Sequence, residues 1–421
     1  MPQKGQQTVA KELFCEIPQG NKNKATICYP GLLFFYDPIM KNINVSPQLQ
    51  QRNLPLDVFR GMTVCFMIIV NTPGDHNTTF APLLHAKWHG FTATDLVFPS
   101  FLFAVGNAKS FVMEKWGTLT ESEVVWKIIR RTALIFLLGY LMYWFPFFKI
   151  DKVTHQFVRF PISETRIMGV LQRIALCYGI AALLIYYFKP RAAVIISISL
   201  LIFYWIVMYS FGDRLNPLSL EGNAGLKFDK WLMGDKHLYH GEGIAFDPEG
   251  WLSTLPAIAN VVAGFMVGKW IQQKGNLYEG LAKLLLAGFA FLVCGYFWDM
   301  LFPINKKLWT SSFVVYTVGL DCIILAMITY IIQFKHKVKW TQFFQVFGKN
   351  TLFIYLLSEL LVTILFMIPV SPRKSLFNWI FVNIFSWGGG YIGSLLFAVS
   401  YMLLCWSVGY WMDKRRIYIK V

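Results

Sequence analysis

The chain has 421 residues, of which 56% are hydrophobic and only 15% are charged. An ordinary soluble globular domain carries about a quarter charged residues, so this composition excludes one. Disorder over most of the chain is also excluded, because 17% of the residues are aromatic. Apolar runs long enough to cross a bilayer recur along most of the sequence, which predicts an all-α polytopic membrane protein embedded in lipid.

The formal net charge is +16, which in a soluble protein would suggest nucleic-acid binding. In a membrane protein the same excess is explained by the Lys and Arg residues that fix helix orientation. We therefore expect no nucleic-acid partner. The seven cysteines include no C-x-x-C pair, so neither a disulfide framework nor a cysteine zinc site is indicated.

Ten membrane-spanning helices are predicted from the apolar runs, with both termini in the cytoplasm. The predicted spans are residues 55–72, 91–113, 128–147, 168–188, 192–211, 251–271, 281–302, 311–334, 343–368 and 388–412. Most Lys and Arg residues then fall in cytoplasmic segments, whereas the external loop 212–250 carries more acids than bases. Around the transmembrane domain, residues 54–412, we expect a polar cytoplasmic extension over 1–53, with a composition compatible with disorder, and a basic tail over 413–421.

Two helix starts carry specific signals. Thr92-x-x-Asp95 has the spacing of a capping box at the start of the second span. Asp247-Pro248-Glu249 places an N-cap, a first-turn proline and a first-turn acid in order, which predicts that the sixth span begins there.

Chemistry is most plausible just before the second span, where His85, His89 and Asp95 follow one another. Histidine titrates near neutrality, so it can take a proton from a nucleophile and return it to a leaving group. A metal site would need helical geometry from His85 to His89 and a third ligand, and no third ligand has convincing spacing. Two plainer interpretations stay open: the histidines as interface residues, and Asp95 as a helix cap alone.

Ionisable or amide groups inside spans are the second signal, because charge in hydrocarbon is costly and often lines a cavity or a pathway. They are Asp57, Arg60, Arg173, Asp299, Asp321, Lys349, Asn350 and Glu359. Some of these groups can serve only to lock helices together. Proton-coupled transport would use the same residue types, so these groups alone do not distinguish a transporter from an enzyme.

Several blocks occur in the order seen in the heparan-alpha-glucosaminide N-acetyltransferase family, and the chain resembles a bacterial member of it. The blocks are residues 56–61 (LDVFRG), 85–99, 169–175 (GVLQRIA), 247–250 (DPEG), 303–310 (PINKKLWT) and 347–350 (FGKN). The resemblance covers about residues 54–412. The first block also resembles that of the acyltransferase-3 membrane enzymes, which acylate sugars outside the cytoplasm.

The resemblance implies transfer of an acetyl group from cytoplasmic acetyl-CoA to the amine of a glucosamine-type sugar or glycan outside the cytoplasm. The family's catalytic His falls on His85 and its catalytic-site Asn on Asn71. The chain departs from the animal pattern in a longer connection between these two residues and in having His89 where the animal pattern has Asn. The resemblance further implies a multi-pass protein of the bacterial inner membrane with His85 near the external side, and a homodimer is one option for its assembly.

A mechanism consistent with this topology has His85 deprotonate the sugar amine or carry the acetyl group covalently. Asn71 would donate to the oxyanion or orient the imidazole, and Asp95 is the third candidate catalytic residue. We expect no metal cofactor. The candidate ligands of the polyanionic donor acetyl-CoA are Lys109, Arg130, Arg131, Arg173, Lys349 and Asn350.

A sugar or amino-sugar transporter is the alternative function. Inverted repeats with glycine-interrupted helices in matching halves would favour it, and the sequence shows no clear internal repeat. A scaffolding protein without catalysis is disfavoured by the gathering of His, Asp and Asn residues beside one span.

Overall fold

The computed structural model describes residues 53–150, 157–371 and 374–419, and helices dominate this part of the chain. The helices are α1 (Leu54–Asn71), α2 (Val97–Glu114), α3 (Glu121–Trp144), α4 (Val170–Tyr187), α5 (Pro190–Phe211), α6 (Ala224–Met233), α7 (Thr254–Lys274), α8 (Tyr278–Asp299), α9 (Ser311–Thr329), α10 (Thr341–Lys349), α11 (Thr351–Met367), α12 (Leu376–Ile380) and α13 (Gly390–Lys414). Strand β1 (Phe148–Ile150) pairs antiparallel with β2 (Phe157–Arg159), and β3 (Pro369–Ser371) pairs antiparallel with β4 (Lys374–Ser375). The expected extension over residues 1–53 lies outside the described residues, apart from Asn53.

The all-α polytopic membrane class is confirmed. Within the described residues, eight helices are long and apolar enough to cross a membrane, or nine if α10 and α11, bent by 82°, form one span. The sequence predicted ten because it counted α3, the 24-residue helix that matches the expected span 128–147. The first half of α3 carries Lys127, Arg130 and Arg131. Because of these charges, α3 is not among the helices that are apolar enough to cross a membrane.

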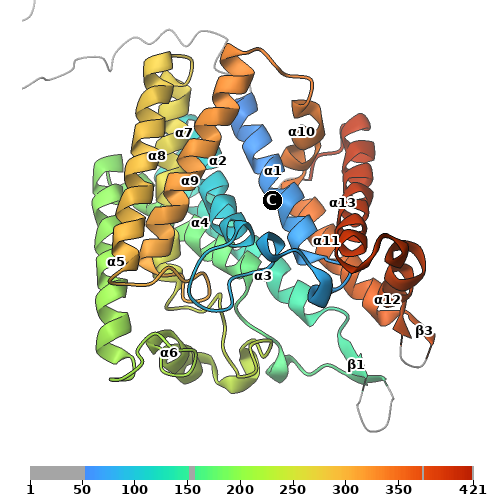
Figure 1. Cartoon of the computed structure of the whole chain (residues 1–421). Coiled ribbons are helices and arrows are strands. Elements are labelled where there is room, and N and C mark those ends of the chain that lie inside the picture. Colours follow the sequence, from blue (N-terminus) through green and yellow to red (C-terminus); the bar gives the residue numbers. More distant parts are fainter. Residues whose placement is uncertain (1–52, 151–156, 372–373, 420–421) are drawn as a thin grey trace, which may run out of the picture. The chain divides into compact units, whose positions relative to one another are not determined.

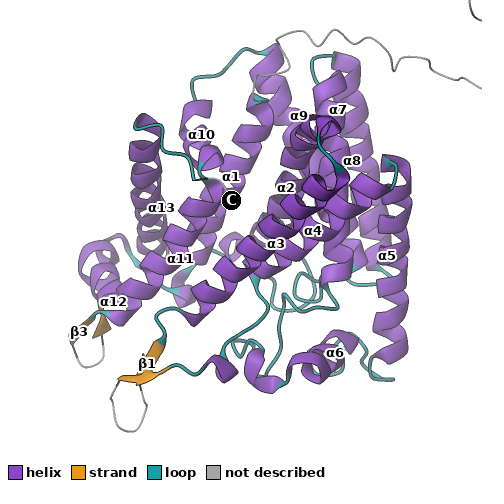
Figure 2. Ribbon diagram, turned by 180° about the vertical axis from the view of Figure 1, so that it is seen from behind, coloured by secondary structure: helices purple, strands orange, loops and turns teal. Residues whose placement is uncertain are grey.

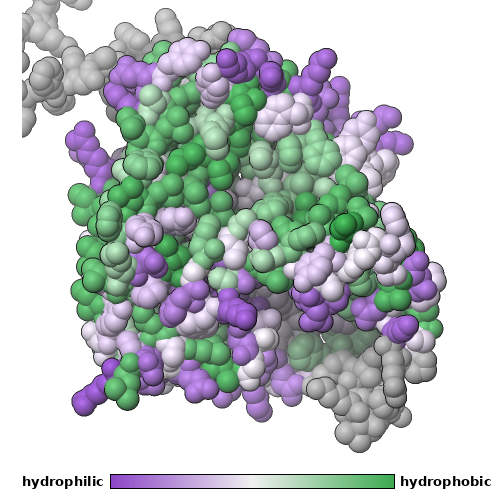
Figure 3. Space-filling model, viewed as in Figure 1, coloured by the Kyte–Doolittle hydropathy of each residue, from purple (hydrophilic) through white to green (hydrophobic). Residues whose placement is uncertain are grey.

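The surface shows the same division into apolar and polar zones. Figure 3 shows hydrophobic side chains over the middle of the face that carries α8 and α9, with hydrophilic side chains gathered towards its upper and lower rims. Leu286 and Phe289 on α8, and Ile195 on α5, are among the exposed large apolar side chains. Such a band between polar rims is expected for helices that face lipid hydrocarbon.

Small residues allow two helices to pack closely in the interior. A methyl group on Gly106 of α2 would lie 2.0 Å from the carbonyl oxygen of Val261, and one on Gly264 of α7 would lie 2.0 Å from that of Phe103. Each helix therefore needs glycine where the other's backbone approaches, as is common between membrane helices. The pairing of α2 with α7 fixes the start of α2, where the candidate site lies.

The two sequence signals for helix starts have different outcomes. The Thr92–Asp95 capping box is confirmed at the short 3-10 turn Ala93–Leu96, which runs directly into α2. The expected start of the sixth span at Asp247 is wrong, because α7 begins only at Thr254. The Asp247 carboxylate accepts the backbone N–H of Glu249 in a turn, and the chain bends again before the helix starts.

The two ends of the helix bundle differ in structure. At one end, called here the His85 end, α1 ends, α2 begins, and the long connections carrying α6 and the β1–β2 and β3–β4 hairpins lie (Figure 1, lower part). At the other, the Lys109 end, the connections between helices are short. Figure 2, seen from behind, shows the same division, with α10 far from α6.

Candidate active site

An imidazole–carboxylate pair lies at the His85 end. His85 Nδ1 is 2.6 Å from Oδ1 of Asp95. The other oxygen of Asp95 accepts the backbone N–H groups of Ala86 at 3.1 Å and Thr92 at 3.0 Å, so the carboxylate is fixed. Asp95 is 1% exposed whereas the His85 ring is 41% exposed. Because a carboxylate only accepts, it holds the proton of a neutral imidazole on Nδ1 and leaves the Nε2 lone pair for another partner.

Lys306 faces that second ring nitrogen. Its Nζ lies 3.4 Å from Nε2 of His85. The lysine sits in a tight turn in which Asn305 Oδ1 accepts the N–H of Leu308 and Thr310 Oγ accepts the N–H of Asn305. Gly90 donates its N–H to the carbonyl of Ile304 at 2.8 Å, which ties this turn to the segment that carries His85.

Burial and charge set the protonation of the pair formed by His85 and Lys306. Burial lowers the pKa of His85 below its usual value near 6.5, and the Lys306 ammonium lowers it further, against the opposing effect of Asp95. Burial also lowers the pKa of Lys306, against the charges of Glu249 and Asp95. The imidazole is therefore neutral at pH 7, the form that can accept a proton.

An ion-pair cluster braces the same region. Arg166 binds Asp247 through Nε at 2.8 Å and Nη2 at 2.6 Å, and Nη2 also lies 2.6 Å from Glu249. The guanidinium lies between two aromatic rings, 4.9 Å from the centroid of Tyr143 and 4.7 Å from that of Tyr239. The acids expected to start a helix thus hold the loop after α3 against the loop before α7.

Asn71 also lies at the His85 end. It is the last residue of α1 and is exposed, and its Nδ2 donates to Oε1 of Glu359 on α11 at 3.3 Å. No hydrogen bond joins it to His85 among the described side chains. Glu359, which the sequence marked as ionisable within a span, is thus a neighbour of Asn71.

His89 has different surroundings from His85. Its Nδ1 is 3.4 Å from Nδ2 of Asn305, and burial lowers its pKa. Within the described ranges, no three His, Cys, Asp or Glu side chains are grouped so as to hold a metal ion. The two histidines therefore have separate partners, a carboxylate for His85 and an amide for His89.

Two of the expected donor ligands come together at the Lys109 end. Lys109 is 3% exposed, donates to Tyr178 Oη at 3.0 Å and lies 3.7 Å from the ring centroid of Trp116. Arg131 is exposed and its Cζ is 4.9 Å from the ring of Tyr178. In the described part of the chain, no carboxylate forms an ion pair with either cation. Arg130 is exposed beside them on α3.

The remaining three expected donor ligands lie elsewhere. Lys349 forms an ion pair with Asp413 at 2.8 Å, and Asn350 bonds the backbone of Ile417 and Ile419, so both engage the C-terminal segment. Arg173 lies at the His85 end, fully buried. It donates to Ser253 Oγ and, at 3.0 Å, to the carbonyl of Gly250.

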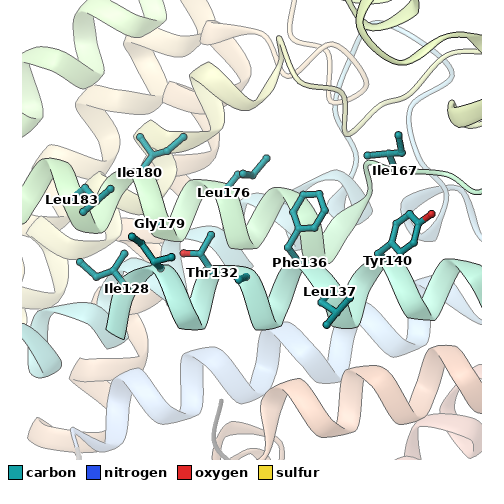
Figure 4. Close-up of a pocket in the computed structure, with 12 residues that line it drawn as sticks. Ile128, Thr132, Phe136, Leu137, Tyr140, Ile167, Leu176, Gly179, Ile180 and Leu183 are labelled. Carbon is teal, nitrogen blue, oxygen red and sulfur yellow. The ribbon is translucent and has the colours of Figure 1, made fainter. Parts of the chain in front are cut away.

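An apolar groove of about 690 Å³ runs between α3 and α4 (Figure 4). Its walls are mainly aliphatic, from Ile128 near one end to Ile167 and Tyr140 near the other, and Gly179 and Thr132 lie next to each other within it. Neither His85 nor Asp95 lines the groove. It suits a hydrocarbon chain and is separate from the polar site.

Known proteins similar to this chain include the heparan-alpha-glucosaminide N-acetyltransferases of Mus musculus and Homo sapiens. The mouse protein is 26% identical over 366 residues, which cover 73% of this chain and 53% of the mouse protein. The human protein is 26% identical over 367 residues, covering 73% and 52%. This similarity supports membership of the heparan-alpha-glucosaminide N-acetyltransferase family. The chain spans about half the length of these curated relatives, and no family model matches it.

Three side chains at the His85 end were missed as site residues from sequence: Lys306, Glu249 and Arg166. Lys306 and Glu249 lie in blocks 303–310 and 247–250, which carried the family resemblance, so a signal was present. Arg166 lies in no such block. Its position became visible only when the fold brought the loop after α3 to that before α7.

Proposed function

We propose that this protein transfers an acetyl group from acetyl-CoA to the amine of a glucosamine-type sugar or glycan. The observation that carries the proposal is the His85–Asp95 pair, in which a buried carboxylate fixes Nδ1 of a neutral imidazole and leaves the Nε2 lone pair, beside Lys306, to accept a proton. The N-acetyltransferase names of the mouse and human relatives support the same reaction class.

In the proposed reaction His85 Nε2 takes a proton from the acceptor's amine, which then attacks the thioester carbonyl directly. The C–S bond breaks as the carbonyl re-forms, and the imidazolium returns the proton to the departing CoA thiolate. Asp95 stabilises the imidazolium and keeps the ring in place. Asn71 and Glu359, hydrogen-bonded to each other at the same end, would contact the bound acceptor sugar.

The donor enters from the Lys109 end, which we assign to the cytoplasm of a bacterial inner membrane. Arg130 and Arg131 are exposed on α3 and offer positive charge there, as phosphate groups require, with Lys109 buried behind them against Tyr178. Asp95 and Lys109 are 14 residues apart, about 20 Å along a helix. A narrow pantetheine arm can cover such a length, so only the acetyl group needs to reach His85.

Purified protein in detergent, mixed with acetyl-CoA and a panel of amino sugars, tests the activity through release of free CoA thiol. Thiol release should require both the sugar amine and His85, so His85→Ala should reduce it to background. His89→Ala, the matched control, should retain measurable activity because its imidazole bonds an amide rather than a carboxylate. If both variants lost activity equally, and zinc restored the activity of wild-type protein treated with a chelator, a metal site would replace the proposed general base.

Labelling of engineered cysteines tests the orientation. A cysteine placed in 213–246, at the His85 end, should react with an impermeant maleimide added to intact cells, and one at 335–339 should not. Reversed labelling would remove the scheme of a cytoplasmic donor and an external acceptor.

A further inference from the structure

Two adjacent lysines of the turn before α9 have contrasting surroundings. Lys307 forms an ion pair with Glu242 at 2.6 Å and donates to the carbonyl of Lys87 at 3.1 Å. Lys306 forms no such pair with any carboxylate of the described residues, and its one hydrogen-bond neighbour is His85 Nε2 at 3.4 Å. The two side chains are chemically identical, but Lys307 has an ion-pair partner and Lys306 has none among the described residues.

The turn fixes the direction of Lys306. Trp309 adopts a left-handed φ of 54°, and its indole Nε1 donates to Asn260 Oδ1 at 3.2 Å, which anchors the turn in the bundle. Asp299 accepts the backbone N–H of Ile304 at the other side of the turn. A residue held in this way has lost the conformational freedom that a surface lysine keeps.

Lysine carries three N–H donors and no acceptor, so contact with one imidazole nitrogen leaves donors available. Glu249 and Asp95 act on Lys306 through their charge alone, without contact. A half-buried ammonium that faces the reacting nitrogen and has donors left over is arranged as catalytic sites arrange groups that bind developing negative charge.

We propose that Lys306 binds the carbonyl oxygen of the transferred acetyl group and stabilises the negative charge that develops on it. This role rests on the proposed acetyl transfer. The C–N bond forms as the carbonyl π electrons move to oxygen, which becomes an oxyanion beside the Lys306 ammonium. The oxygen's electron pair then re-forms the carbonyl, and the C–S bond breaks. The sulfur leaves with the electron pair of that C–S bond, and His85 gives the resulting thiolate the proton taken from the amine.

The Lys306→Met variant, with Lys307→Met as its matched control, tests the role, because methionine has a similar length and no N–H donor. Loss of one donor to an oxyanion reduces kcat by about 10²–10³-fold in enzymes of known mechanism. We expect a fall of that size for Lys306→Met, with the affinity for acetyl-CoA changed by no more than about 3-fold. Lys307→Met should keep kcat within about 3-fold of the wild type. Equal kcat values for the two variants would overturn the proposal.

Two further measurements separate a bond to the carbonyl from a structural role. Lys306→Cys should be inactive, and alkylation with 2-bromoethylamine, which rebuilds an ammonium side chain, should restore at least a tenfold higher kcat, with alkylated wild type as the reference. The infrared carbonyl band of [1-¹³C]acetyl-CoA should shift to lower frequency on binding to wild-type protein and to His85→Ala, and not on binding to Lys306→Met.

The outcomes distinguish this inference from the proposed function. A wild-type band that stays at its solution position would overturn the role of Lys306 even if some variants fail to fold. Acetyl transfer that persists in such an experiment would leave the proposed function intact. Absence of any acetyl transfer by the wild type would instead remove both.

Discussion

The two carboxylate oxygens of Asp95 have different partners: Oδ1 is paired with the His85 imidazole, and Oδ2 with backbone N–H groups. Oδ1 lies 2.6 Å from His85 Nδ1, while Oδ2 accepts the backbone N–H of Thr92, where the turn into α2 begins, and that of Ala86, next to His85. The start of a membrane helix and the orientation of the candidate catalytic imidazole therefore depend on one buried residue. The two interpretations of Asp95 that the sequence left open, a cap and a site residue, are compatible in one geometry.

Asp95→Asn should lower kcat by about 10²–10⁴-fold, because an amide next to Nδ1 no longer selects the tautomer that leaves Nε2 free. The cost in folding free energy should be near that of a weakened cap, about 1 kcal/mol. Steady-state kinetics together with thermal unfolding would measure both effects.

A second capping box supplies the control. Thr120 and Glu123 form the same reciprocal bonds at the start of α3, far from His85. Glu123→Gln should leave kcat unchanged, since that box orients no catalytic group. If Glu123→Gln and Asp95→Asn reduce kcat alike, Asp95 serves only the fold.

The pH dependence of kcat/KM should reflect the lowered pKa of His85. A general base works only when unprotonated, so activity is lost as the pH falls through the His85 pKa. Because burial and Lys306 lower that pKa, the acidic limb should lie below pH 6.5. Lys306→Gln should move the limb to higher pH, and Asp95→Asn, which removes the opposing carboxylate, to lower pH. A limb that stays fixed in both variants would show that another group titrates.

Much of the fold followed from the sequence because hydrophobic runs are a strong signal for membrane helices. The order of spans was readable, and so was the cap at Thr92, where spacing and residue type agree. The start of α7 was misread because Asp247 and Glu249 have the residue types of a helix start. Their carboxylates instead bind Arg166, 81 and 83 residues away along the chain. A local pattern holds no information about so distant a partner.

The candidate site was only partly predictable for the same reason. His85 and Asp95 lie ten residues apart and were both named from sequence. Lys306 lies 221 residues from His85, and one of two neighbouring lysines could not be preferred without the fold. Lys349 and Asn350 were grouped with the donor ligands by residue type, and the structure places them against the C-terminal segment.

The donor site should depend on Arg130 and Arg131. Changing both to Gln should weaken acetyl-CoA binding much more than amino-sugar binding, because only the donor is polyanionic. Changing Arg415 and Arg416, at the end of α13, to Gln is a control that removes the same charge from another part of the chain. Binding calorimetry on the two double variants would decide the matter: unchanged donor affinity in Arg130→Gln/Arg131→Gln would leave these residues a role in orientation alone.

Asp229 of α6 should make folding stability depend on pH. Burial raises its pKa from an ordinary 3.8 to about 7, while its Oδ1 accepts the N–H of Trp251 at 2.9 Å. The unfolded chain releases this proton near pH 4 and the folded chain only near pH 7. The folded state therefore loses stability as the pH rises across that window and does not regain it above.

Asp229→Asn keeps an acceptor for Trp251 and removes the charge, so it should raise the thermal midpoint more at pH 8 than at pH 5. Asp235→Asn, in the exposed turn that follows α6, is the matched control and should show no such difference. Melting of both variants in detergent at the two pH values measures the effect. A gain for Asp229→Asn that is equal at pH 5 and pH 8 would mean that the carboxylate is already ionised in the folded protein.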